Sequence, residues 1–235
     1  MPLAFEQEAS KYDDWFLKNR NVLYSEVLLV KYFLEKYGVG KALSVGCGSA
    51  LFEMILRDEF DIRVDYCLEP AEGMAKIAER RGFKVDRGYA ENLPYPDEFF
   101  DTVIQNGTIH YVDDPKKAIE ESYRVLRRGG QIIIAWVAGE SSYGILYQLA
   151  GVLGNWEPLK KIAPKDPYPI EFIREAKRWP TAEEVGELVK SAGFMNMEFA
   201  QTLTTHPKYS NDLVEEPSEG YTKGDYIALR ATKPF

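Results

Sequence analysis

The 235-residue sequence has few of the side chains that build covalent or metal-held frameworks. Its only cysteines are Cys47 and Cys67, and its only histidines are His110 and His206. Two cysteines favour neither a disulfide framework nor a structural zinc cluster, and no close spacing of His, Cys and carboxylates indicates a metal site. The sequence therefore predicts no bound metal, and a reducing compartment is expected.

Excess positive charge and long apolar runs are also missing. There are 29 Lys and Arg against 37 Asp and Glu, which gives a formal net charge of -8. Such a chain lacks the overall basic surface that gathers nucleic acid, so a nucleic-acid partner is not expected. No apolar stretch has the length of a membrane span, and the acidic N-terminal sequence resembles neither a signal nor a transit peptide. We expect a cytoplasmic protein without a membrane partner.

Short apolar runs alternate with amphipathic patterns through residues 40–138. The expected strands are 42–46, 62–68, 83–86, 101–105 and 131–137. The expected helices between them are 50–59, 71–81 and a helix that begins at the N-cap Asp114, has Arg127 and Arg128 in its last turn and ends at Gly129 and Gly130. This alternation predicts an α/β fold with a mostly parallel sheet and helices on both faces.

The pattern changes in the last hundred residues. Residues 139–180 combine Gly, Pro and scattered aromatics, which indicates an inserted cap. Thr181 and Glu184 form a capping box that opens another helix. The expected strands near 194–204 and 224–232 have no helix between them, so they should pair antiparallel. We predict a Rossmann-like open sheet of seven strands with an antiparallel C-terminal strand.

A Gly-Cys-Gly turn at 46–48 follows the first expected strand, where the backbone must approach a ligand closely. A dinucleotide site usually has a third glycine for the pyrophosphate, but Leu51 stands there, so the loop suits a nucleoside without a pyrophosphate. Glu69 ends the second expected strand, where a carboxylate can accept both ribose hydroxyls. The alternative for Glu69 is a solvent-facing side chain before a helix-starting proline.

Four motifs, in order, resemble the class I S-adenosylmethionine-dependent methyltransferases, specifically their small-molecule, UbiE-like branch (methyltransferase type 11). VGCGSALFE resembles the cofactor loop, LEPAEGM the ribose-binding turn and GYAENLPYPDEFFD the adenine-binding turn. RVLRRGGQIIIAW resembles the junction between a helix and the fifth strand. The resemblance covers roughly residues 40–138.

This resemblance implies that S-adenosylmethionine is the cofactor and S-adenosylhomocysteine the product. The residues that it places at the cofactor are Gly46, Cys47, Gly48 and Ser49 in the loop, Glu69 and Pro70 at the ribose, and Tyr89, Ala90 and Glu91 at the adenine. Many relatives have an acidic residue at position 89, so Tyr89 either stacks on the adenine or packs in the core. Tyr12 lies in a segment that resembles an aromatic lid, for which the alternative is a plain amphipathic helix.

Asn106 and His110 follow the expected strand 101–105, at the edge where ligands meet open α/β sheets. The Asn106 amide offers a donor and an acceptor to the amino-acid end of the cofactor, and its alternative role is that of a turn residue. His110 is a candidate catalytic residue because its ordinary pKa lies near neutrality, so it could take a proton from a hydroxyl or an amine. Its alternative role is capping or packing.

The predicted organisation is one methyltransferase domain. Its expected parts are an N-terminal helical lid (1–39), a cofactor-binding core (40–138), an inserted substrate cap (139–180) and a C-terminal helix with a β-hairpin (181–235).

The expected reaction is in-line transfer of the sulfonium methyl group to a small organic acceptor. Methyltransferases that act on the exocyclic amines of nucleic-acid bases typically have an Asn/Asp-Pro-Pro-aromatic element. This sequence lacks it, because Gly107 follows Asn106. Arg174, Lys177 and Arg178 either pair with an acidic substrate or form a solvated surface. The alternatives are a non-catalytic module that binds S-adenosylmethionine and a nicotinamide-dependent oxidoreductase. The sequence predicts neither the acceptor nor the oligomeric state.

Overall fold

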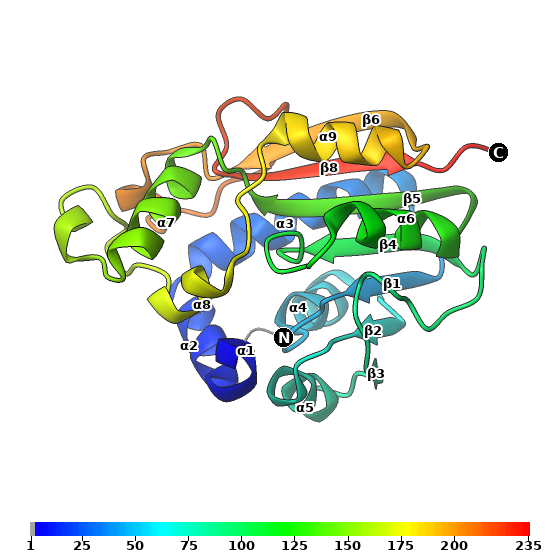
Figure 1. Ribbon diagram of the computed structural model, residues 1–235, viewed down its shortest axis with the longest axis horizontal. Coiled ribbons are helices and arrows are strands. Elements are labelled where there is room, and N and C mark those ends of the chain that lie inside the picture. The colour runs from blue at the N-terminus through cyan, green and yellow to red at the C-terminus, as the bar shows by residue number, and fades with distance from the viewer. Residues whose placement is uncertain (1–2) are drawn as a thin grey trace.

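An open sheet of eight strands forms the centre of the computed structural model, which describes residues 3–235 (Figure 1). The strands are β1 (Ala42–Val45), β2 (Tyr66–Leu68), β3 (Val85–Asp86), β4 (Phe100–Asn106), β5 (Leu126–Val137), β6 (Met195–Thr202), β7 (Ser218–Glu219) and β8 (Tyr226–Thr232). Their order across the sheet is β3-β2-β1-β4-β5-β8-β6-β7. The pairs from β3 to β5 are parallel, whereas β8 is antiparallel to both β5 and β6. The predicted fold class and the antiparallel closing pair are confirmed.

The predicted count of seven strands is wrong by one. The additional strand, β7, has two exposed residues that pair antiparallel with Ala200 and Gln201 of β6 at the sheet edge. A strand this short and exposed has no apolar alternation from which a sequence could predict it. In addition, β5 begins at Leu126 rather than at 131, because Leu126 already pairs with Phe100 before an irregularity in the register.

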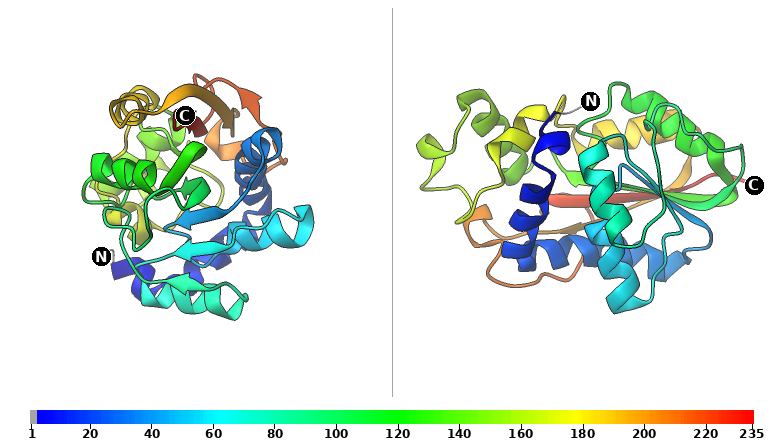
Figure 2. Two further views of the ribbon diagram at one scale, coloured as in Figure 1. Left: turned by 90° about the vertical axis from the view of Figure 1, so that its right-hand side faces the viewer. Right: turned by 90° about the horizontal axis from the view of Figure 1, so that it is seen from below.

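Helices cover both faces of the sheet. They are α1 (Leu3–Gln7), α2 (Ala9–Lys18), α3 (Arg20–Tyr37), α4 (Leu51–Phe60), α5 (Glu72–Arg80), α6 (Pro115–Val125), α7 (Ser142–Leu153), α8 (Ile170–Glu175) and α9 (Ala182–Ser191), with short 3-10 turns η1 (Glu157–Leu159) and η2 (Pro207–Tyr209). On one face α3 packs against α4 and the strands β5, β6 and β8, and on the other α6 packs against β5 and α9 (Figures 1 and 2). Within residues 3–235, no helix combines the length and the apolar character needed to cross a bilayer.

The two predicted helix starts are present. The Asp114 side chain accepts a hydrogen bond of 3.0 Å from the Lys117 backbone N–H at the start of α6, and Pro115 occupies the first turn. At the start of α9, Thr181 and Glu184 form both hydrogen bonds of the capping box. These caps satisfy free backbone N–H groups in the first turn and so fix the residue at which each helix begins.

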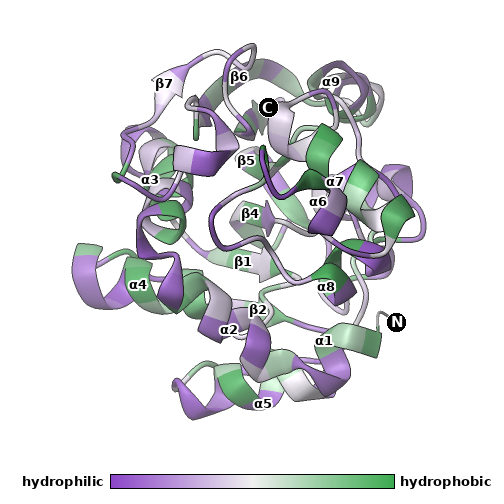
Figure 3. Ribbon diagram, turned by 90° about the vertical axis from the view of Figure 1, so that its left-hand side faces the viewer, coloured by the Kyte–Doolittle hydropathy of each residue, from purple (hydrophilic) through white to green (hydrophobic). Residues whose placement is uncertain are grey.

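Four helices gather at the end of the molecule toward which the parallel strands point. Figure 3 views this end, with α1, α2, α7 and α8 around the ends of β1, β4 and β5. The expected lid and cap are in contact here, since α8 packs on α1 and the Trp15 indole donates a 3.1 Å hydrogen bond to the Asp166 carbonyl. The first two residues of the expected lid 1–39 lie outside the described residues.

Candidate functional site

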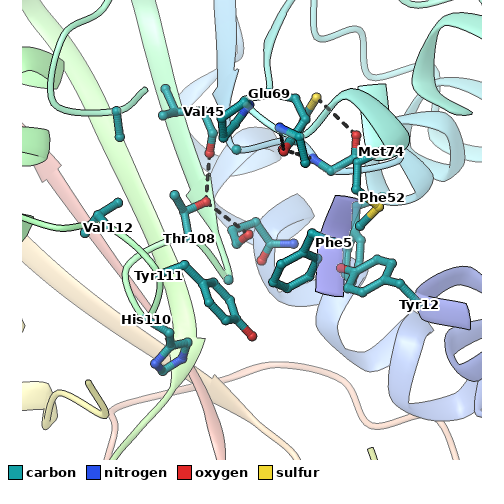
Figure 4. Close-up of a pocket in the computed structure, with 18 of the residues that line it drawn as sticks. Phe5, Tyr12, Val45, Phe52, Glu69, Met74, Thr108, His110, Tyr111 and Val112 are labelled. Atoms are coloured by element: carbon teal, nitrogen blue, oxygen red, sulfur yellow. Dashed lines mark hydrogen bonds between the residues drawn. The ribbon is translucent and has the colours of Figure 1, made fainter. Parts of the chain in front are cut away.

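A pocket lies where β1, β2 and β4 end, and α2 and the cap contribute its outer walls (Figure 4). All but one of the residues predicted for the site line it, namely Tyr12, Gly46, Cys47, Gly48, Glu69, Pro70, Tyr89, Ala90, Glu91, Asn106 and His110. The exception is Ser49. The tertiary structure therefore brings residues from five separate segments to one pocket.

The glycine-rich loop is held tightly between strand ends. Gly46 has a φ of +70°, and a Cβ atom there would lie 2.7 Å from the Thr108 hydroxyl. The backbone N–H groups of Gly46 and Cys47 both donate to the Leu68 carbonyl, at 2.8 and 3.1 Å. A larger residue at 46 would thus require a strained backbone and would displace Thr108. Glycine at this position is required by the packing of the loop on the turn after β4 as much as by a ligand.

Glu69 is buried at the end of β2, with 6% of its surface exposed, so the solvent-facing alternative is wrong. Its Oε2 accepts a 2.9 Å hydrogen bond from the Gly48 N–H and its Oε1 accepts a 2.8 Å hydrogen bond from the Ala71 N–H. Burial raises the pKa of Glu69 to about 7, although both backbone donors favour the ionised form. Each carboxylate oxygen keeps a lone pair that can accept from a ligand hydroxyl.

Ser49 lies beneath the loop rather than in the pocket. Its buried Oγ donates to Asp13 Oδ1 at 2.5 Å, and its carbonyl accepts from Arg81 Nη1 at 2.7 Å. Arg81 also forms an ion pair of 2.7 Å with Asp13. The contacts of Ser49 thus connect the loop to α2 instead of pointing to a ligand.

The turn before β4 forms another wall of the pocket. Tyr89 is 53% exposed there, so the alternative that it packs in the core is wrong. Ala90 is buried beside it, and Glu91 Oε1 accepts from the backbone N–H groups of Asp113 and Asp114 at 2.6 and 3.2 Å. Glu91 therefore attaches this turn to the segment that precedes α6.

Asn106, the last residue of β4, is oriented by a strand far away in the sequence. Its Oδ1 accepts a 2.7 Å hydrogen bond from the Tyr226 hydroxyl on β8. Two residues on, the Thr108 hydroxyl donates to the Val45 carbonyl at 2.8 Å and ties this turn to β1. With Oδ1 engaged, the Asn106 side chain offers its amide N–H donors to a ligand.

His110 is buried, with 4% of its surface exposed, and lies across the pocket from Glu69 (Figure 4). Its Nδ1 donates a 3.1 Å hydrogen bond to the Arg178 carbonyl, so Nε2 carries the lone pair of the neutral ring. That buried Nε2 has no hydrogen-bond partner among residues 3–235. Burial lowers the pKa of His110 to about 4, and the positive charge of Arg178 acts in the same direction.

Two of the basic cap residues, Lys177 and Arg178, bind protein groups. Lys177 forms an ion pair with Asp113, and the Arg178 guanidinium donates to the carbonyls of Val112 and Asp113. The Lys177 N–H also donates to the His110 carbonyl at 2.8 Å. These contacts fasten the cap to the loop after β4, and Lys177 also lines the pocket.

Known proteins with this arrangement were found by sequence and by structure. The family model of the methyltransferase domain matches residues 43–134. A Thermotoga maritima crystal structure described as an S-adenosylmethionine-dependent methyltransferase, possible histamine N-methyltransferase, is 34% identical, with a TM-score of 0.83 over 99% of both chains. An uncharacterized protein of Methanocaldococcus jannaschii is 34% identical over 98% of both chains. A demethylmenaquinone methyltransferase of Roseiflexus castenholzii is 28% identical, covering 68% of this chain and 70% of its own length.

The chain belongs to the S-adenosylmethionine-dependent methyltransferases. Because the similarity to a known methyltransferase covers the full length of the chain, this methyltransferase is an enzyme with S-adenosylmethionine as its cofactor. The oxidoreductase alternative is wrong. The pocket fits that cofactor, because it is lined both by a buried carboxylate with free lone pairs, Glu69, and by the amide donors of Asn106.

Several pocket residues of this methyltransferase were not predicted from the sequence. Among them are Glu26 of α3 and Tyr226 of β8. Glu26 carries a recognisable signal, since it lies four residues after Val22 and four before Val30, both of which are buried on the inner side of the helix. Tyr226 carries none, because an aromatic residue at the start of a strand is typical of any sheet.

Proposed function

We propose that this methyltransferase methylates a small organic molecule that binds in the aromatic part of the pocket. The observation that carries the proposal is a set of aromatic side chains that line the pocket, contributed by the N-terminal helices, the loop after β4, the cap and β8: Tyr12, Tyr111, Tyr147, Tyr168, Trp179 and Tyr226. The rings pack closely, with 5.9 Å between the centroids of Tyr147 and Tyr168. Such an enclosed, mostly apolar chamber suits a small molecule better than a polymer.

The proposed cofactor contacts follow from the polar groups of the pocket. Glu69 would accept the ribose hydroxyls, the Asn106 amide would donate to the amino-acid end, and Tyr89 with Ala90 and Glu91 would border the adenine. When bound, S-adenosylmethionine supplies a sulfonium methyl group that passes in line to a nucleophile and leaves S-adenosylhomocysteine.

The protein's own contribution is alignment and exclusion of water. Holding two reactants in line can supply roughly 7 to 11 kcal/mol of the barrier reduction. We assign the lid function to residues 1–39 together with the cap 139–180, since Tyr12 of α2 and Tyr168 of the cap both line the chamber. The segment 181–235 completes the sheet and contributes Tyr226.

His110 is proposed to orient the acceptor. Its free Nε2 can accept a hydrogen bond from an N–H or O–H group of the bound molecule. Because its pKa is lowered to about 4, the ring is a weak base that holds the nucleophile in position more than it removes a proton.

Two measurements test the proposed function. Calorimetric titration with S-adenosylmethionine, S-adenosylhomocysteine and NAD should show binding of the two sulfur nucleosides alone, weakened in Glu69→Ala. Release of S-adenosylhomocysteine should then require a small acceptor from a panel of amines, phenols and thiols. Methyl label from S-adenosylmethionine that entered only RNA or protein would contradict a small-molecule acceptor.

A further inference from the structure

Glu26 is a carboxylate buried inside the aromatic chamber. It belongs to α3, only 6% of its surface is exposed, and its side chain lines the pocket. Burial raises the pKa of Glu26 well above its ordinary value, with no opposing contribution from a hydrogen bond or a cation. Such a group is costly to bury, because its charged form loses most of its hydration.

The other carboxylates that line the inner pocket have partners. Glu53 accepts a 2.6 Å hydrogen bond from the Ser44 hydroxyl, and Glu69 accepts from two backbone N–H groups. Within residues 3–235 the Glu26 carboxylate has no hydrogen bond and no ion pair, and its oxygens are not among the fully buried side-chain atoms, so they are accessible from the chamber. The one lysine in the pocket wall, Lys177, is paired with Asp113.

Four tyrosines of the chamber lie near Glu26. Burial raises the pKa of the hydroxyls of Tyr12, Tyr147, Tyr168 and Tyr226, and the nearby negative charge of Glu26 raises it further in each. All four side chains line the same chamber as Glu26. Ring faces attract cations through their quadrupole, so the rings and the carboxylate together favour a positively charged ligand.

We propose that Glu26 binds an ammonium group of the methyl acceptor, which would make the acceptor a small organic amine that enters the aromatic chamber as a cation. This inference rests on the proposed function, since it names the class of molecule that the chamber takes. A cation would complete the contacts of a buried carboxylate that the protein leaves without a partner, and the surrounding rings would stabilise the same charge. An anionic acceptor would meet Glu26 with like charge and an apolar wall.

Matched ligands test the charge preference without any mutation. The protein is loaded with S-adenosylhomocysteine and titrated calorimetrically with 2-phenylethylamine, with its neutral counterpart 2-phenylethanol and with the anion 3-phenylpropionate; histamine serves as a second cation. We expect the amines to bind about tenfold to a hundredfold more tightly than the alcohol, the range for one charge-assisted hydrogen bond, and the anion to bind most weakly.

A pair of variants then tests the residue. Glu26→Gln keeps the side-chain shape and should abolish the preference for amines over the alcohol, while the affinity for S-adenosylhomocysteine changes less than about twofold. Glu35→Gln removes the same charge from the exposed, distal part of α3 and should bind amines like the wild type.

The outcomes separate this inference from the function on which it rests. Failure of the wild type to bind S-adenosylhomocysteine would overturn the proposed function. Binding of S-adenosylhomocysteine with equal affinities for amine and alcohol would overturn the ammonium site alone, and this result does not depend on whether Glu26→Gln folds. An equal loss of amine and S-adenosylhomocysteine affinity in Glu26→Gln would assign Glu26 to the cofactor site and would also overturn the inference.

Discussion

The Ser49 hydroxyl of the glycine-rich loop donates a 2.5 Å hydrogen bond to the Asp13 carboxylate of α2. Arg81, just after α5, joins this buried pair through an ion pair of 2.7 Å with Asp13 and a hydrogen bond to the Ser49 carbonyl. The N-terminal helix that carries Tyr12 is therefore fastened to the loop expected to hold the cofactor. Loss of the Asp13 charge should affect both folding and ligand binding.

Asp13→Asn is expected to lower the free energy of unfolding by about 1–3 kcal/mol, because Arg81 loses a charged partner in a buried position. Urea denaturation measures this change, and calorimetry should show weaker binding of S-adenosylhomocysteine. Asp14→Asn, at an exposed neighbouring position, is the matched control and should change stability by less than about 0.5 kcal/mol. Equal effects of the two substitutions would contradict a special role for the Asp13 network.

The affinity for S-adenosylhomocysteine should rise with pH near neutrality. The pKa of Glu69 is raised to about 7, and only the ionised carboxylate can accept hydrogen bonds from both ribose hydroxyls with all of its lone pairs. Between about pH 6 and about pH 8 the ionised fraction increases, so binding should tighten by up to about tenfold. Calorimetric titrations across this range, repeated for Glu69→Gln, isolate the contribution of this group. A wild-type profile that ran parallel to that of Glu69→Gln would show that Glu69 does not titrate in the site.

The Tyr226 hydroxyl should matter for cofactor affinity through Asn106. Tyr226→Phe removes the hydrogen bond that orients the Asn106 amide, and we expect S-adenosylhomocysteine to bind about threefold to tenfold more weakly. Tyr143→Phe is the matched control, because it also loses a buried hydroxyl contact, with the Ser210 hydroxyl, outside this pocket. Unchanged affinity in Tyr226→Phe would show that Asn106 does not depend on this contact.

His110 should destabilise the fold in acid. Its pKa falls from 6.5 in the unfolded chain to about 4 in the folded protein, so the stability it contributes is complete above 6.5 and is lost as the pH falls toward 4. The loss amounts to about 3 kcal/mol over that interval. Urea denaturation near pH 7.5 and near pH 4.5 should show a smaller acid loss for His110→Asn than for the wild type. Identical losses would mean that the buried ring is not the group that takes up the proton.

Local signals were sufficient for most of the sheet and for its helix starts. The alternation of residues 40–138 predicted the parallel strands, because a strand buried on both faces needs a continuous apolar run. Asp114 and the Thr181 capping box act within one helical turn, so neighbouring residues alone predicted them correctly. The exposed strand β7 has no comparable local pattern and was missed.

The sequence predicted which positions belong to the site, but it could not predict which side chains these residues contact. Ser49 directly follows the pocket-lining Gly48 in the sequence, yet its hydroxyl binds Asp13 of a separate helix. A sequence motif identifies the residues that follow a strand, but it does not identify the distant helix that packs beneath them.

The sequence by itself determined the α/β alternation, the glycine-rich turn after β1 and the acidic residue at the end of β2, since each depends on residues close together in the chain. Only the tertiary structure decided what surrounds the acceptor. It placed the Tyr226 hydroxyl, 120 positions away in sequence, on Asn106, and it left Glu26 without a partner among aromatic rings from other elements. Periodicity shows that one side of α3 is buried, but the groups that meet Glu26 there depend on how distant segments pack.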